Sequence, residues 1–295
     1  MRRGRVRHCL IFLLLALLLS PLSGMAEETD NDRDVLLRMA EKGDPAAQFT
    51  LGLALQTGRD REKNPAQAAE WYRRAAEQGF LNAQYNLAVL YLNGEGVAAD
   101  AVQAAYWFEQ AGKQGMVKAQ FNLGMLYLGE RGLPEDPARA ALWLKKAADQ
   151  GHAGAMFSLA GLYATGRGVP EDRQEAIRLY RLAADKGEIG SWCNLGNIYA
   201  DSSSPLHDQY RAFECYQTGA SLGDAVAQYN LGIMYLQGRG TLKNRAMAWA
   251  WFRLAGDNGY SDAEGILNKL EQLLDETEKA MARVEYENLQ RQLQQ

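Results

Sequence analysis

The chain has 295 residues and a formal net charge of −4, and 47% of its residues are hydrophobic. This length alone allows one or two domains. The acidic balance disfavours a nucleic-acid partner, because a negatively charged protein is repelled by phosphate backbones. The internal pattern of the chain has to decide the rest.

The first 26 residues have the layout of a secretory signal peptide. Arginines at the start precede an apolar run from Cys9 to Leu19, and small residues stand at Gly24 and Ala26. The run is shorter than the about 20 residues of a spanning helix, so we expect cleavage after Ala26; an uncleaved anchor is the alternative. Cleavage removes four arginines and no acid, which leaves 269 residues with a net charge of −8. The mature part contains no further apolar segment that could enter a membrane.

From residue 45 the chain repeats itself with a constant period of 36 residues. "LNAQYNLAVLYLNGEGVAADAVQAAYWFEQAGKQGM" and "AVAQYNLGIMYLQGRGTLKNRAMAWAWFRLAGDNGY" are two of the copies. Self-similarity at such a period is the signature of stacked repeats. The six consecutive copies are 45–80, 81–116, 117–152, 153–188, 189–224 and 225–260.

Each copy predicts two helices joined by a glycine-rich turn. In the first copy, apolar residues at four-residue spacing predict a helix from about Ala47 to Gln56. An Asp or Asn then caps the second helix, and a glycine stops it. The caps are Asn64, Asp100, Asp136, Asp172, Asp208 and Asn244, and the stops are Gly79, Gly115, Gly151, Gly187, Gly223 and Gly259. In the turns, Glu130 of the third copy and Ser202 and Ser204 of the fifth replace glycines, so loop shape is open there.

The two ends of the repeat array should differ from its middle. One helix pair cannot bury its own apolar face, so terminal units need capping elements. Residues 27–44 predict an acidic linker and an N-terminal capping helix, and residues 261–295 predict C-terminal capping helices.

The recurring pattern A-x-x-x-L-G-x-x-Y-x-x-G-x-G-V-x-x-D-x-x-x-A-x-x-W-Y-x-x-A-A-x-x-G resembles the Sel-one-like repeat (SLR), a relative of the tetratricopeptide repeat, over residues 45–260. The resemblance implies an all-α, right-handed superhelix, or α-solenoid, whose first helices line a concave face. It also implies a scaffolding or protein-recognition role, typically without chemistry.

The spacing of the first helices predicts which positions face that concave side. One position carries a row of polar side chains that could pair with the backbone of an extended peptide, as in an asparagine ladder of tetratricopeptide relatives. The row consists of Asn86, Asn122, Ser158, Asn194 and Asn230, flanked by the apolar Val89, Met125 and Ile233. In the fourth copy, Gly154, Ser158, Gly161 and Thr165 could open a notch. The alternative is that the asparagines bond to the backbone of the next repeat and stabilise the stack.

The mature cysteines, Cys193 and Cys215, both fall in the fifth copy and replace an aromatic residue of most other copies. Their midpoint is the centre of the turn, so they should lie at similar height on the two helices. In an exported protein this favours a disulfide, with two buried thiols as the alternative.

The sequence carries no recognisable catalytic or metal-binding constellation. His152 and His207 have no ligands at metal spacing, and no S-x-x-K motif is present. Gly219 to Gly223 fits the G-x-S-x-G nucleophile pattern, but Ser221 falls near the end of a predicted helix rather than on a strand–helix elbow. We therefore expect no enzyme and no cofactor; a weak hydrolase acting on cell-wall or β-lactam substrates is the alternative.

These observations predict an exported interaction scaffold that binds an unknown protein or peptide. The periplasm is the expected location, with secretion as the alternative. Regulation of envelope complexes and interaction with a host are both compatible with the sequence, and a monomer is plausible.

Overall fold

The structure is a computed structural model that describes residues 30–59, 61–129 and 131–293. These residues form fifteen helices and contain no strand, which confirms the predicted all-α repeat fold. The predicted signal peptide and Glu130 lie outside the described residues. The chain divides into two compact units, residues 1–80 and 81–295, and each is described by itself.

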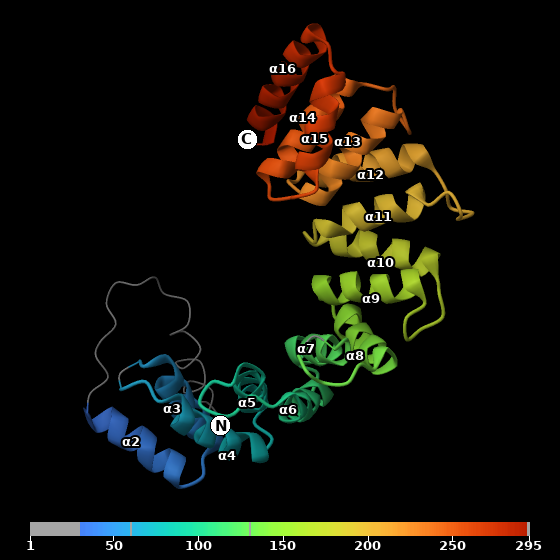
Figure 1. The fold of residues 1–295 in the computed structure, drawn as a ribbon. Helices are drawn as coiled ribbons and strands as arrows, with labels where there is room; N and C mark the ends of the chain where they lie inside the picture. The colour runs from blue at the N-terminus through green and yellow to red at the C-terminus, as the bar shows by residue number, and fades with distance from the viewer. Residues whose placement is uncertain (1–29, 60, 130, 294–295) are drawn as a thin grey trace, which may run out of the picture. The chain divides into compact units, whose positions relative to one another are not determined.

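The described part of the first unit consists of three helices, α2 (Asp30–Glu41), α3 (Pro45–Thr57) and α4 (Pro65–Glu77) (Figure 1). Asp44 caps α3, because its carboxylate accepts from the Ala47 N–H at 2.7 Å. Leu51 on α3 and Tyr72 on α4 are buried between the helices. Gly52 lets this pair approach closely, since a Cβ there would lie 2.8 Å from the Tyr72 ring.

The second unit continues the repeat array and ends in two further helices. From α5 to α14 each helix packs against the one that follows it in the chain, and α15 and α16 both pack on α14 (Figure 1). The helices are α5 (Leu81–Asn93), α6 (Ala101–Lys113), α7 (Val117–Tyr127), α8 (Pro137–Asp149), α9 (Ala153–Thr165), α10 (Arg173–Asp185), α11 (Gly190–Ala200), α12 (Gln209–Ser221), α13 (Ala225–Gln237), α14 (Arg245–Asp257), α15 (Ala263–Leu273) and α16 (Glu276–Leu293). No helix in the described part of the chain combines the length and apolarity needed to cross a membrane.

The predicted helix boundaries hold because they depend on local chemistry. All six predicted caps accept a hydrogen bond from a first-turn N–H of the second helix. Such a cap stabilises a helix by about 1 kcal/mol. All six stop glycines take a positive φ, between 84° at Gly79 and 92° at Gly115, where an L side chain is strained. The first helices run slightly longer than predicted, as α3 shows with Pro45–Thr57.

The turns between paired helices differ in the two copies where glycine is replaced. In the fourth and sixth copies, Gly168 and Gly240 have positive φ and touch the preceding repeat: a Cβ on Gly168 would lie 2.3 Å from the Pro137 carbonyl carbon. In the third copy α7 ends early, at Tyr127, and Gly129 takes the positive φ instead. In the fifth copy side chains form the turn, because Asp201 accepts from both the N–H and the hydroxyl of Ser203.

The C-terminal helices close the stack on its last repeat. Ala263 and Leu267 of α15 are buried, in register with the first helices of the repeats. Ala282 is the buried residue of α16, and Tyr286 of the same helix meets Trp249 of α14 edge to face. These contacts cover apolar surface that a seventh repeat would otherwise have to bury.

Candidate functional site

The predicted polar row lies entirely in the second unit, on the helices α5, α7, α9, α11 and α13. All five members, Asn86, Asn122, Ser158, Asn194 and Asn230, are half-buried. Three of the five side chains contact a residue on the preceding first helix. The flanking apolar residues Val89, Met125 and Ile233 are half-buried as well.

Part of the row is held by the preceding repeat. The Asn122 amide donates to the Tyr85 hydroxyl at 3.3 Å, and the Asn230 amide contacts the Cys193 sulfur at 3.6 Å. Ser158 donates to the Met125 sulfur at 3.5 Å. Sulfur is a weak acceptor, so the two sulfur contacts orient Ser158 and Asn230 more than they stabilise the stack. The alternative prediction, bonding to the backbone of the next repeat, is not what these three residues do.

The other two members have free amides. Asn122 and Asn230 each contact the residue 37 positions earlier in the chain. For Asn194 that residue is Phe157, whose side chain has no hydrogen-bond acceptor. Neither Asn86 nor Asn194 makes a side-chain hydrogen bond with the described residues. Each therefore presents one acceptor and two donors to a ligand.

The small residues of the fourth repeat leave less room than predicted. A Cβ on Gly154 would lie 3.4 Å from the Phe121 ring, and one on Gly161 would lie 3.4 Å from the Tyr180 hydroxyl. Thr165 donates to the Gly161 carbonyl at 2.8 Å. Neighbouring rings thus line the notch closely, and it is not an open cavity.

Sequence reasoning missed a ladder of buried amides beside this row. Gln120 donates to the Gly112 carbonyl at 2.9 Å and accepts from the Gln150 amide at 2.7 Å, which links α6, α7 and α8. Gln228 does the same with Ala220 and Asn258. A buried amide is tolerated only when its hydrogen bonds are satisfied. The signal was in the sequence, as amides that recur 30 residues apart.

The ladder is interrupted in the fourth and fifth repeats. The two positions of the pair become Met156 and Lys186 in the fourth and Trp192 and Leu222 in the fifth. Both members change together in each case, so no buried amide loses its partner. These two repeats therefore lack the amide–amide hydrogen bond that their neighbours have.

The cysteines correct a prediction, because Cys193 and Cys215 are both buried and free in the structure. They lie on opposite sides of their helix pair. The Cys193 sulfur faces Asn230 on α13, whereas Cys215 lines a hollow beside Arg181 of α10. Equal height along two helices is therefore not enough for a disulfide, which also requires the side chains to point toward one another. Burial raises the pKa of the Cys193 thiol to about 12 and that of Cys215 to about 11.

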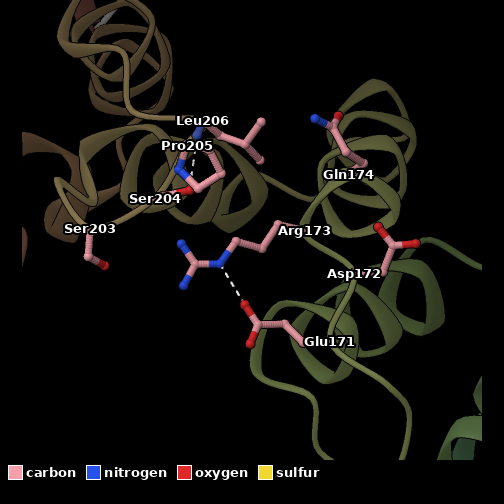
Figure 2. Close-up of a pocket in the computed structure, with 8 residues that line it drawn as sticks. All are labelled: Glu171, Asp172, Arg173, Gln174, Ser203, Ser204, Pro205 and Leu206. Carbon is pink, nitrogen blue, oxygen red and sulfur yellow. Dashed lines mark hydrogen bonds and ion pairs between the residues drawn. The ribbon is translucent and has the colours of Figure 1, made fainter.

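The altered turn of the fifth repeat borders a hollow of about 490 Å³ (Figure 2). Arg173 crosses it and pairs with Glu171 at 2.7 Å and with Asp201 at 2.6 Å. The Ser203 hydroxyl, followed by the Arg173 guanidinium, lowers the pKa of the Asp201 carboxyl to about 2. Arg173, Glu171 and Asp201 are already paired with one another, so we assign these ion pairs to stabilising the turn rather than to binding a ligand.

No catalytic arrangement emerges from the described residues. The Ser221 hydroxyl donates to the Thr218 carbonyl at 2.8 Å in the last turn of α12, as its predicted place near a helix end requires. His152 caps α9 and stacks on Phe121, and burial lowers the pKa of its imidazole. Among the described residues no group of three or more potential ligands is placed to hold a metal ion.

Comparisons with known proteins identify the repeat. The family model of the Sel1 repeat matches residues 45–80, 81–116, 117–152, 153–188, 193–224 and 225–260. A protective antigen present in uropathogenic Escherichia coli strains, displaying an SLR fold, is 28% identical with a TM-score of 0.62, over 89% of this chain and 64% of that one. A Sel1 repeat protein from Oxalobacter formigenes is 30% identical with a TM-score of 0.58, over 76% of this chain and 92% of that one. This chain thus spans less than two thirds of the Escherichia coli antigen, and no curated protein matched it.

Proposed function

Because the chain belongs to the Sel1 repeat family, whose repeats generally mediate protein–protein interaction, we propose that it is an exported scaffold that binds an extended protein segment along the polar row. The scaffold performs no chemistry of its own. Its partner is a protein or peptide of the bacterial envelope, met in the periplasm, with secretion toward a host as the other destination of an exported chain.

The free amides of Asn86 and Asn194 carry this proposal. These two carboxamides lie three repeats apart, so each can bond a different peptide group of one extended chain that runs along the row, while Val89, Met125 and Ile233 offer apolar contact beside them. Because the stack does not use these two amides, their position on the half-exposed face has no structural explanation. The N-terminal sequence, with its arginine start and short apolar run, supports export.

Site-specific photocrosslinking tests the binding face. A crosslinking residue replaces Val89 beside the row or, as the control, the exposed Leu142 of α8. We expect one partner to crosslink from position 89, not from position 142, and to be lost when Asn86→Ala and Asn194→Ala are added. Equal crosslinking from both positions, or no effect of the alanines, would contradict the proposal.

Export is tested separately, by fractionating cells and sequencing the N-terminus of the recovered chain. The proposal predicts a chain that begins at Glu27 in the periplasmic or extracellular fraction. A full-length chain in the cytoplasm would refute export and leave the binding face untouched.

A further inference from the structure

At its junction with the fourth repeat, the fifth repeat differs from most other repeats at two positions, 192 and 215. In four other repeats the position of Cys215 holds a tryptophan, and Trp107, Trp143 and Trp251 are each buried to within 7% exposure. Trp143 and Gln120 both pack against Gly112, since a Cβ there would lie 3.1 Å from the Trp143 ring and 3.3 Å from the Gln120 side chain. In the fifth repeat the indole stands instead at position 192, where the third repeat has Gln120.

This exchange coincides with a hollow of about 600 Å³ between the helices α10, α11 and α12, which lie side by side in Figure 1. We call it the Cys215 pocket. Cys215, Trp192 and Leu195 form its apolar walls. Trp192 is half-buried, so its indole lines the hollow without filling it. Burial raises the pKa of the Cys215 thiol to about 11, which keeps it a neutral, apolar part of the wall.

Arg181 lines this pocket and does not pair with the acid four residues later in its own helix. In the third and sixth repeats the residue at the position of Arg181 pairs with an acid one turn later, as Lys145 does with Asp149 and Arg253 with Asp257. Arg181 makes no ion pair with any described carboxylate, although Asp185 is available at the same spacing. It donates to the Tyr199 hydroxyl at 3.0 Å instead.

The remaining charges at the rim limit what the pocket can accept. Arg211 lies 5.6 Å from the centroid of the Tyr199 ring and is paired with Asp208 at 3.4 Å. The Glu214 carboxylate also lines the pocket and repels a ligand of high negative charge. Arg181, with four of its five N–H donors unused by Tyr199, is therefore the group that can bind a single carboxylate.

We propose that the Cys215 pocket binds an aromatic side chain that carries a carboxylate beside it, as in an acidic–aromatic segment of a partner peptide. The ring stacks against Trp192 and Leu195 in the space that a tryptophan occupies in other repeats. The carboxylate pairs with Arg181, whose planar donors suit a carboxylate. This site is separate from the polar row, and either site can be present without the other.

Ligand-observed NMR of the full chain tests the pocket with N-acetyl-tryptophan, which has a free carboxylate, and N-acetyl-tryptophanamide, which has none. We expect saturable binding of the acid that is at least about tenfold weaker in Arg181→Gln. We expect weaker binding of the amide, with no change in that variant. Arg253→Gln, the corresponding change in the sixth repeat, should leave the binding of both probes unchanged.

A second variant tests the cavity itself. Cys215→Trp introduces the tryptophan found in four other repeats and should abolish binding of the acid. Its melting temperature reports whether the variant folds. If it does not fold, the Arg181→Gln variant alone tests the proposal. The pocket proposal is overturned if the acid shows no saturable binding to the wild type. It is also overturned if the acid binds Arg181→Gln as tightly as wild type, or if a folded Cys215→Trp variant retains binding. None of these outcomes bears on crosslinking from position 89.

Discussion

The third and fifth repeats occupy equivalent places in one scaffold and solve the same packing problem differently. In the third, a buried glutamine, Gln120, joins three helices through two hydrogen bonds, and Trp143 fills the junction. In the fifth, Trp192 and Cys215 take these positions and leave a hollow. The frame therefore tolerates replacement of a whole set of contacts, provided that no buried amide is left without its partner.

The turns show the same contrast. Gly168 and Gly240 bring the turns of the fourth and sixth repeats against the preceding repeat, whereas the fifth uses Asp201, Ser203 and Arg173. The departures from the repeat consensus thus gather in the fifth repeat. A repeat in which the turn, the amide pair and the junction tryptophan are all replaced is where we expect a specialised surface.

Substitution of a turn glycine should cause the largest loss of unfolding free energy. Gly168→Ala forces a side chain into positive φ and against the Pro137 backbone, so we expect a loss of about 3 kcal/mol of unfolding free energy. Gly132→Ala, whose φ is also positive but whose added Cβ meets nothing within 4 Å, should cost about 1 kcal/mol. Urea unfolding measures both, and equal losses would refute the role of close approach.

A smaller effect tests the amide ladder. Gln120→Met, which imports the residue of the fourth repeat, removes two hydrogen bonds and should cost about 2 kcal/mol. The reverse exchange, Met156→Gln with Lys186→Gln, should show a favourable coupling of about 1 kcal/mol in a double-mutant cycle. Additive single effects in that cycle would mean that the two positions do not form a pair.

The smallest effect concerns the serine-containing turn. The pKa of Asp201 is lowered to about 2 from its usual 3.8, so its contribution is present above about pH 4 and is lost as the pH falls toward 2. We expect wild type to melt at a higher temperature than Asp201→Asn at neutral pH, with the difference closing between pH 4 and pH 2. A difference that is unaffected by pH would exclude the charge of Asp201 as its cause.

The fold could be predicted from sequence because its determinants are local and recur six times. The caps at Asp100 or Asp208 and the stop at Gly115 act within one helix turn, and repetition separates them from chance. The Gln120–Gln150 bond escaped prediction because it joins side chains 30 residues apart on different helices. The disulfide prediction was wrong because height along a helix pair says nothing about side-chain direction.

The candidate site was predictable only in part for the same reason. Helical periodicity predicts that Asn86 and Asn194 share one face of the first helices, and both are half-buried in the structure. Which of its amides remain free depends on the residue 37 positions earlier, a contact between repeats. The direction of Arg181, toward Tyr199 rather than Asp185, likewise depends on the packing of neighbouring helices.

The affinity of the crosslinked partner for wild type and for the Asn86→Ala, Asn194→Ala variant tests the central claim most directly. Asn82→Ala with Asn268→Ala, both on exposed positions, is the matched control. If the row binds the partner, the dissociation constant should rise at least about tenfold in the row variant, at the melting temperature of wild type and with the control unchanged. An unchanged dissociation constant, or one that rises only together with a lower melting temperature, would contradict the claim that these asparagines form the binding face.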